Sequence, residues 1–185
     1  LHLSSAASDV YKRQNYNKVL TSKRIAVVGA GPAGISFSIT AAQRGHVVSL
    51  FEESNEIGGQ LNFAKMIPGK EEFHGLLNYY KNEIKRLKID LITDHKVKTT
   101  DLINFDEIII STGVVPRKID IEGQDKVNFV YDYQEVFNGR VKLGNRIAII
   151  GAGGIGFDVA EYISSSGISP TLDINKWMEK WGVTD

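Results

Sequence analysis

The sequence contains no cysteine, carries no net charge and has only short apolar runs, and each absence excludes a class of function. With 0 cysteines among 185 residues, disulfides, thiolate metal sites and iron–sulfur ligation are excluded from this stretch. The 22 lysines and arginines balance 22 aspartates and glutamates, so nucleic acid and membranes are not expected partners. No apolar run reaches the roughly 18 residues that span a bilayer.

The first 14 residues, LHLSSAASDVYKRQ, have no helical or strand periodicity. They also lack the basic and apolar regions of a signal peptide. We interpret residues 1–14 as a non-native, adapter-derived segment or a disordered tail, and leave them out of the fold prediction.

Apolar periodicity after this segment predicts alternating strands and helices. The predicted strands are Ile25–Val28, Val47–Phe51, Ile89–Ile92, a short piece around Val97, Glu107–Ser111 and Arg146–Ile150. The predicted helices run from Gly34 to about Arg44, from Glu71 to about Leu87, from Gly154 to about Ser164, and over Asn175–Trp181. Trp177 and Trp181 are spaced to share one helix face.

An internal repeat lies within this pattern. IAVVGAGPAG at Ile25–Gly34 recurs as IAIIGAGGIG at Ile147–Gly156, 122 residues later. That offset is too long for a solenoid period. It predicts an α/β chain with a Rossmann-like domain followed by the first strand and helix of a second, truncated one.

The first copy has the pattern Gly29-x-Gly31-x-x-Gly34 between a strand and a helix. These glycines allow a tight turn, close approach of the backbone to a pyrophosphate, and close packing of helix on strand. Glu52 lies 23 residues beyond Gly29 at the end of the next strand, where an acid accepts hydrogen bonds from a ribose. The alternative is a glycine-rich turn without a ligand.

Two further segments have features of a flavin site. Gly58-Gly59-Gln60 follows the ribose acid, and a Gly-Gly pair there is typical of FAD-binding members of this fold. Thr112 and Gly113 follow a strand that we expect to be buried, and ligands of open α/β sheets bind at the carboxyl ends of strands. An ordinary turn and a plain strand exit are the alternatives.

The second copy, Gly151-x-Gly153-x-x-Gly156, predicts a second nucleotide site, with FAD bound at the first loop and a nicotinamide nucleotide at this one. Asp158 follows on the predicted helix. It either contacts the nicotinamide end of the nucleotide or acts as an acid at the helix N-terminus. Because this second fold breaks off early, we expect the apolar faces of Ile147–Ser164 to be exposed.

No catalytic acid–base pair and no metal site are predicted. His46, His74 and His95 are scattered, and we interpret them as surface or turn residues. This suits a flavin carrier, because the cofactors perform the hydride chemistry.

The stretch from about Lys23 to Asp185 resembles the C-terminal half of bacterial NADPH-dependent 2,4-dienoyl-CoA reductases, in the NADH:flavin oxidoreductase/old-yellow-enzyme group. The resemblance is carried by VVGAGPAG, GHVVSLFEESNEIGGQLNFAKMIPGKEEF, FDEIIISTGVVPR and AIIGAGGIGFDVAEY. EKWG at Glu179–Gly182 matches an insertion of that family.

The resemblance implies an electron relay that extends beyond this chain. NADPH would reduce FAD, and electrons would pass through a [4Fe–4S] cluster to FMN, which reduces an enoyl-CoA-type substrate. The FMN barrel and the cluster would lie N-terminal to Lys23, outside this chain. The resemblance also implies that Ala33, Glu52, Gln60, Lys70 and the backbone at Val97 contact FAD, although Lys70 is equally interpreted as an exposed lysine.

Together these arguments predict an FAD-binding domain over residues 15–140 and the start of an NAD(P)-binding domain over 141–185, in a cytoplasmic enzyme of fatty-acid β-oxidation. The alternative is a non-catalytic scaffold that holds ADP or FAD in a related amine dehydrogenase. A disulfide reductase is disfavoured by the absence of cysteine. The predicted cofactor-binding residues are Gly29, Gly31, Pro32, Ala33, Gly34, Glu52, Gly59, Gln60, Lys70, Val97, Thr112, Gly113, Gly151, Gly153, Gly154, Ile155, Gly156 and Asp158.

Overall fold

The computed structural model describes residues 16–117, 119–127, 129–166 and 169–183. The segment 1–14, interpreted above as non-native or disordered, lies outside them. The chain forms two compact units. The first holds the described residues up to Ile57 together with Tyr80–Thr112, and the second holds Gly58–Tyr79 and the described residues from Gly113 onward. The expected domain limits, 15–140 and 141–185, stay predictions.

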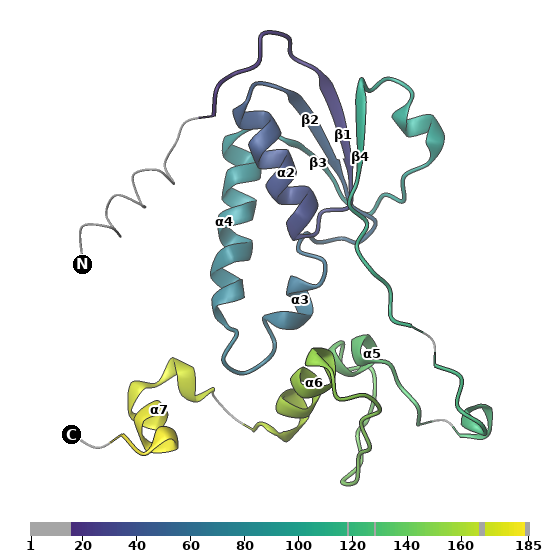
Figure 1. Ribbon diagram of the computed structural model, residues 1–185, viewed down its shortest axis with the longest axis vertical. Coiled ribbons are helices and arrows are strands. Elements are labelled where there is room, and N and C mark those ends of the chain that lie inside the picture. Colours follow the sequence, from purple (N-terminus) through teal and green to yellow (C-terminus); the bar gives the residue numbers. More distant parts are fainter. Residues whose placement is uncertain (1–15, 118, 128, 167–168, 184–185) are drawn as a thin grey trace. The chain divides into compact units, whose positions relative to one another are not determined.

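From Arg24 to Ile110 one or two helical elements separate each strand from the next, and the described elements after Ile110 are all helical (Figure 1). In chain order they are β1 (Arg24–Val28), α2 (Pro32–Gln43), β2 (Val47–Phe51), α3 (Leu61–Ala64), α4 (Glu72–Arg86), β3 (Asp90–Ile92), the 3-10 turn η1 (Thr99–Leu102), β4 (Glu107–Ile110), η2 (Gln124–Lys126), α5 (Tyr133–Phe137), α6 (Gly154–Ser164), η3 (Pro170–Leu172) and α7 (Ile174–Trp181).

The first unit is built on a four-stranded sheet of order β3-β2-β1-β4, with every pairing parallel. Val28, at the end of the central strand β1, is in register with Phe51 on one side and Ile110 on the other. The carboxyl ends of these strands therefore meet at one edge, which is where open α/β sheets bind their ligands. The predicted α/β fold is confirmed.

The core of this unit includes side chains from both faces of the central strand. Ile25, Ala26 and Val27 on β1 are 0 to 5% exposed, and Val48, Leu50 and Phe51 on β2 are equally buried. Figure 1 shows α2 and α4 beside each other against the sheet, and a hydrogen bond of 3.2 Å joins Ser36 Oγ on α2 to Tyr80 Oη on α4. Each buried aliphatic side chain stabilises the fold by about 1.5–3 kcal/mol. Burial of apolar side chains therefore contributes strongly to holding the sheet and helices together.

The expectation that Glu107–Ser111 forms a fully buried strand is wrong. β4 is the last strand of the sheet, and Ile108 and Ile110 are 45% and 66% exposed. Within the described part of the chain no further strand pairs with β4. Three consecutive isoleucines gave an apolar run, but a run does not say how many faces of a strand are covered.

Two other predicted strands do not form. Arg146–Ile150 and the piece around Val97 have no regular secondary structure. A strand needs a neighbour to accept and donate its ladder hydrogen bonds, and among the described residues no segment pairs with either. β-branched composition alone therefore does not produce a strand at these places.

The second unit has its own apolar cluster, formed by Ile67, Phe137 and Val159 and by the partly buried Phe63, Tyr133, Tyr162 and Ile163. The expected exposure of apolar side chains in Ile147–Ser164 is confirmed for Ile149, Ile155 and Phe157, which are 40%, 53% and 68% exposed. The predicted C-terminal helix forms as α7, with its two tryptophan rings 6.3 Å apart. No helix within the described ranges is both long and apolar enough to cross a membrane.

Candidate nucleotide-binding sites

The first glycine loop joins β1 to α2, and two of its glycines are required by contacts. Gly29 has φ of +105°, and a Cβ there would collide with the carbonyl oxygen of Ser111. A Cβ on Gly34 would collide with the carbonyl oxygen of Gly29. The loop is therefore folded back on itself and held against the end of β4, with no room for a side chain at either position.

Gly31 differs, because a Cβ at this position would meet nothing within 4 Å. Its glycine is not needed for packing inside the protein. It leaves an open approach to the backbone, as expected where a phosphate lies against the chain. Gly31 is also the N-cap of α2, with Pro32 in the first turn and no side chain accepting from the free N–H groups.

The N-termini of the helices separate into two kinds. Asp132 caps α5 by accepting from Glu135 N–H, and Asp173 caps α7 by accepting from Asn175 and Lys176 N–H. The two glycine-loop helices, α2 and α6, have no side-chain cap and no acid in the first turn, and the four-residue α3 shares both features. Their N–H groups are thus left available to an anion, and the helix dipole adds positive potential there.

Glu52, the predicted ribose acid, is brought to this loop. Its Oε2 accepts from Ala30 N–H at 2.7 Å, and its Oε1 accepts from Ser54 N–H at 2.9 Å and Ser54 Oγ at 2.8 Å. The carboxylate is therefore fixed in orientation at the end of β2. The sequence pattern did not single out Ala30 or Ser54, although a serine two residues after an acid is a local turn signal.

Ser111 is a structural part of the loop that the prediction also missed. Its Oγ reaches the carbonyl oxygens of Val28 and Gly29, both at 3.0 Å, and its N–H donates to Val28 O at 2.8 Å. The predicted Thr112 and Gly113, which follow, are exposed.

Three further residues that were predicted to contact the cofactor lie in the first unit. Pro32 and Ala33 are exposed on the first turn of α2, and Val97 is half-buried in the loop between β3 and η1.

The Gly-Gly segment lies in the second unit. Gly58 and Gly59 have φ of +119° and +51°, and a Cβ on Gly58 would come within 2.6 Å of Leu77 Cδ2. Gln60 follows as the N-cap of α3. Its Oε1 accepts from Tyr133 Oη at 3.2 Å, which places the side-chain amide against the apolar cluster of this unit. Tyr133 had no sequence signal.

The second glycine loop reproduces the backbone of the first. Gly151 has φ of +106°, against +105° for Gly29, and a Cβ on Gly156 would collide with Gly151 O just as one on Gly34 would collide with Gly29 O. Gly153 and Gly154 have no atom within 4 Å of an added Cβ. The internal repeat is therefore a repeat of conformation as well as of sequence. Ile155, also predicted to contact the nucleotide, is exposed on the first turn of α6.

Asp158 on α6 and Lys70 in the loop before α4 form an ion pair, with Nζ and Oδ1 2.6 Å apart. The two side chains are 39% and 31% exposed, for Lys70 and Asp158 respectively. From the sequence, Lys70 was expected to contact FAD and Asp158 the nicotinamide nucleotide. In the structure the two side chains pair with each other.

The neighbouring Glu71 fixes the same loop to η3. Its carboxylate accepts from Gly69 N–H at 3.1 and 3.0 Å and from Thr171 Oγ1 at 2.8 Å. Partial burial disfavours its charge, but hydrogen bonds from Ser169, its own N–H, Gly69 and Thr171 outweigh burial and lower the pKa of Glu71 to about 2.

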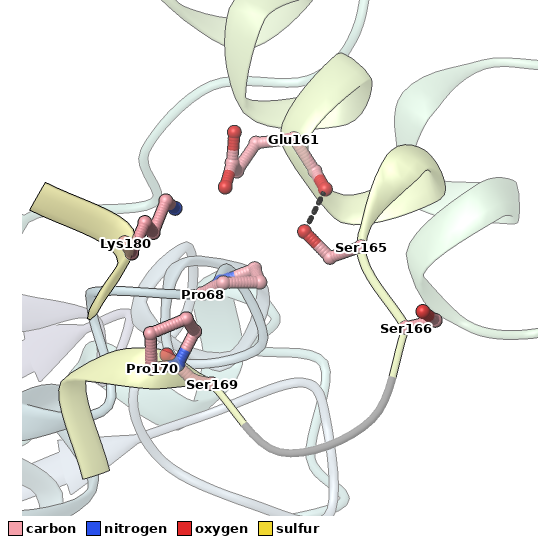
Figure 2. Close-up of a pocket in the computed structure, with 7 residues that line it drawn as sticks. All are labelled: Pro68, Glu161, Ser165, Ser166, Ser169, Pro170 and Lys180. Carbon is pink, nitrogen blue, oxygen red and sulfur yellow. Dashed lines mark hydrogen bonds between the residues drawn. The ribbon is translucent and has the colours of Figure 1, made fainter. Parts of the chain in front are cut away.

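A small hollow of about 210 Å³ lies nearby in the second unit (Figure 2). Figure 2 shows Ser165 Oγ donating to the carbonyl oxygen of Glu161, at 2.6 Å. The residues that line the hollow are Pro68, Glu161, Ser165, Ser166, Ser169, Pro170 and Lys180. None of the predicted cofactor-binding residues lines this hollow. Among all the described residues, no group of three or more histidine, aspartate or glutamate side chains is placed to hold a metal ion.

Comparison with known proteins assigns the chain to a family. The profile of the family described as pyridine nucleotide-disulphide oxidoreductase matches residues 23–176. The chain is 33% identical to an NADH oxidase of Thermoanaerobacter brockii over 81% of its own length and 24% of that protein. It is 35% identical to a bilirubin reductase of Mediterraneibacter gnavus over 78% of its own length and 23% of that protein.

Among solved structures, a complex of 2-naphthoyl-CoA reductase with 2-naphthoyl-CoA is similar, with a TM-score of 0.75 and 30% identity over 90% of this chain. The matched region is 28% of that protein. The chain thus spans about a quarter of the length of the relatives it matches.

Proposed function

The chain belongs to the pyridine nucleotide-disulphide oxidoreductase family, and from this premise we propose that it binds FAD at its first glycine loop and NAD(P)H at its second, so that a hydride passes from NAD(P)H to FAD. The observation that carries this proposal is the repeated, uncapped glycine-loop and helix unit, with Glu52 fixed beside the first copy. With 0 cysteines, this chain has no residues for disulfide chemistry.

At the first loop, different residues would bind different parts of a dinucleotide. The N–H groups at the start of α2 face an anion without competition from a side chain, and Gly31 leaves the approach open. Glu52 would accept from a ribose hydroxyl at Oε2, because Oε2 accepts only one bond, from Ala30 N–H, whereas Oε1 already accepts two from Ser54. Thr112 and Gly113 would lie at the carboxyl edge of the sheet, as proposed cofactor contacts.

At the second loop, Gly151, Gly153, Gly154, Ile155 and Gly156 would receive the phosphates of the pyridine nucleotide in the same manner. When bound, FAD and NAD(P)H would supply the hydride chemistry themselves. The chain's own residues bind and orient the nucleotides and keep the loops in shape. We propose NADPH as the donor, on the resemblance to 2,4-dienoyl-CoA reductases.

We further propose that the whole protein reduces a carbon–carbon double bond in an acyl-CoA substrate. Support comes from the resemblance and from the similarity to 2-naphthoyl-CoA reductase. FMN, a [4Fe–4S] cluster and the substrate site would be carried by parts outside this chain, and the enzyme would act in the cytoplasm, in fatty-acid β-oxidation.

The test is cofactor recovery followed by reduction. The purified chain, incubated with FAD and desalted, is expected to keep a yellow flavin spectrum, which NAD(P)H bleaches under anaerobic conditions. Recovery of ADP with no retained flavin would overturn the redox function and support a nucleotide-holding scaffold. Retained flavin that neither NADH nor NADPH bleaches would restrict the function to FAD binding.

A further inference from the structure

The ion pair between Lys70 and Asp158 lies where it bears on the second nucleotide site. Asp158 is the fifth residue of α6, which begins at Gly154. At 1.5 Å of rise per residue, its carboxylate is rooted about 6 Å along the axis from the first residue of the helix. A bare carboxylate at that distance would oppose the positive potential that an uncapped N-terminus offers to a phosphate.

Lys70 neutralises the negative charge of Asp158. Its Nζ lies 2.6 Å from Asp158 Oδ1, and the two side chains are only 39% and 31% exposed. Partial burial reduces the screening by water, so the charge of an unpaired Asp158 would reach further toward the loop. The Lys70 backbone is itself held, because its N–H donates to Ile67 O at 3.0 Å, and Ile67 is part of the apolar cluster that also contains Val159 of α6.

We propose that Lys70 is a positioning and charge-neutralising residue of the pyridine nucleotide site, which acts through Asp158 and not by contacting a nucleotide. This inference rests on the proposed function, because it assigns a role within the second site. It differs from the roles expected from the sequence, in which Lys70 contacts FAD and Asp158 contacts the nicotinamide nucleotide or acts as an N-terminal acid.

The test is a double-mutant cycle on the full chain loaded with FAD, with NADPH and NADH affinity measured by calorimetry. Lys70→Met should weaken binding about 3- to 10-fold at low salt, and less at high salt, because the exposed Asp158 charge is then screened. Asp158→Asn should leave affinity unchanged or slightly tighter. The double variant should return to the wild-type value, and Lys70→Arg should keep it.

The matched control is Lys96→Met, since Lys96 also forms a lysine–carboxylate ion pair, with Glu53 at 3.1 Å, in the first unit. It should leave NAD(P)H affinity unchanged. FAD affinity, measured in parallel, should be the same in wild type and in Lys70→Met.

Three results would overturn the inference. One is a loss in Lys70→Met that Asp158→Asn does not rescue, and another is a loss of FAD affinity, since both would make Lys70 a direct ligand contact. The third is a loss in Asp158→Asn as large as that in Lys70→Met, which would make Asp158 the contact. Failure of the wild-type chain to bind either nucleotide would instead refute the proposed function.

Discussion

Ala30 N–H donates a hydrogen bond of 2.7 Å to Glu52 Oε2 and so joins the first glycine loop to the end of β2. The bond crosses 22 residues of sequence. It places a negative charge beside a helix N-terminus that has no cap of its own. The site therefore offers N–H donors at the start of α2 to a phosphate and, next to them, the Glu52 carboxylate to a ribose.

The first prediction concerns this acid. Glu52→Ala should raise the dissociation constant for FAD about 10- to 100-fold, because hydrogen bonds to a charged group contribute about 1.5–3 kcal/mol. Flavin fluorescence titration measures it. Glu53→Gln is the control, since Glu53 is 66% exposed and pairs with Lys96. Equal losses in both variants would contradict a specific role for Glu52.

The second prediction separates the glycines of the first loop. Gly34→Ala should destabilise the fold by about 2 kcal/mol or more, because its methyl group would collide with Gly29 O and with Ser111 Oγ. Gly31→Ala should change stability by less than about 1 kcal/mol, since nothing lies within 4 Å of its Cβ. It should still weaken FAD binding about tenfold, by filling the approach to the backbone.

Chemical denaturation and FAD titration of both variants measure the difference between the two glycines. If Gly31→Ala bound FAD as tightly as wild type, the open space beside Gly31 would have no part in the site.

The third prediction is a pH dependence. The pKa of Glu71 is about 2, below the ordinary value of 4.5, so its contacts with Gly69 and Thr171 stabilise the fold fully above about pH 4.5. That contribution should be lost as the pH falls from 4.5 toward 2. Melting temperatures across this range should fall more steeply for wild type than for Glu71→Gln.

The neighbouring variant Glu72→Gln is the control for this pH dependence and should behave like wild type. A carboxyl chemical shift of Glu71 that titrates near 4.5 would refute the assigned hydrogen bonds.

The fourth prediction concerns the segment before the second glycine loop. The N–H groups of Ile147–Ile150 form no strand ladder, whereas those of β1 are paired on both sides. Hydrogen exchange at Ile147–Ile150 should therefore be faster than at Ile25–Val28 by about 100-fold or more. Comparable protection in the two segments would mean that the second copy also forms a paired strand.

Several features were accessible from the sequence because each depends on residues close together in the chain. Ile25–Phe51 predicted the first β-α-β unit, and the spacing from Gly29 to Glu52 predicted which acid would reach the loop. Helical spacing likewise predicted that Trp177 and Trp181 share a face of α7, as their 6.3 Å ring separation bears out. Local backbone preferences and periodicity are sufficient for such features.

Other features were not accessible, because they depend on residues that meet only after folding. Ser111 supports the first loop from 82 residues away, and Lys70 meets Asp158 across 88. Tyr133 reaches Gln60 across 73. No local pattern marked Ser111 or Tyr133, and the resemblance marked Lys70 as an FAD contact and not as the partner of Asp158.

The sequence by itself determined the alternation of elements, the repeated glycine loops and the conformation of those loops, since glycine at positive φ and the strand–turn–helix order are local properties. Only the tertiary structure decided which apolar runs become strands. Ile25–Val28 gained neighbours on both sides, and Ile147–Ile150, with a nearly identical composition, gained none among the described residues. A strand is defined by its partners, and a partner is a long-range contact that no local pattern encodes.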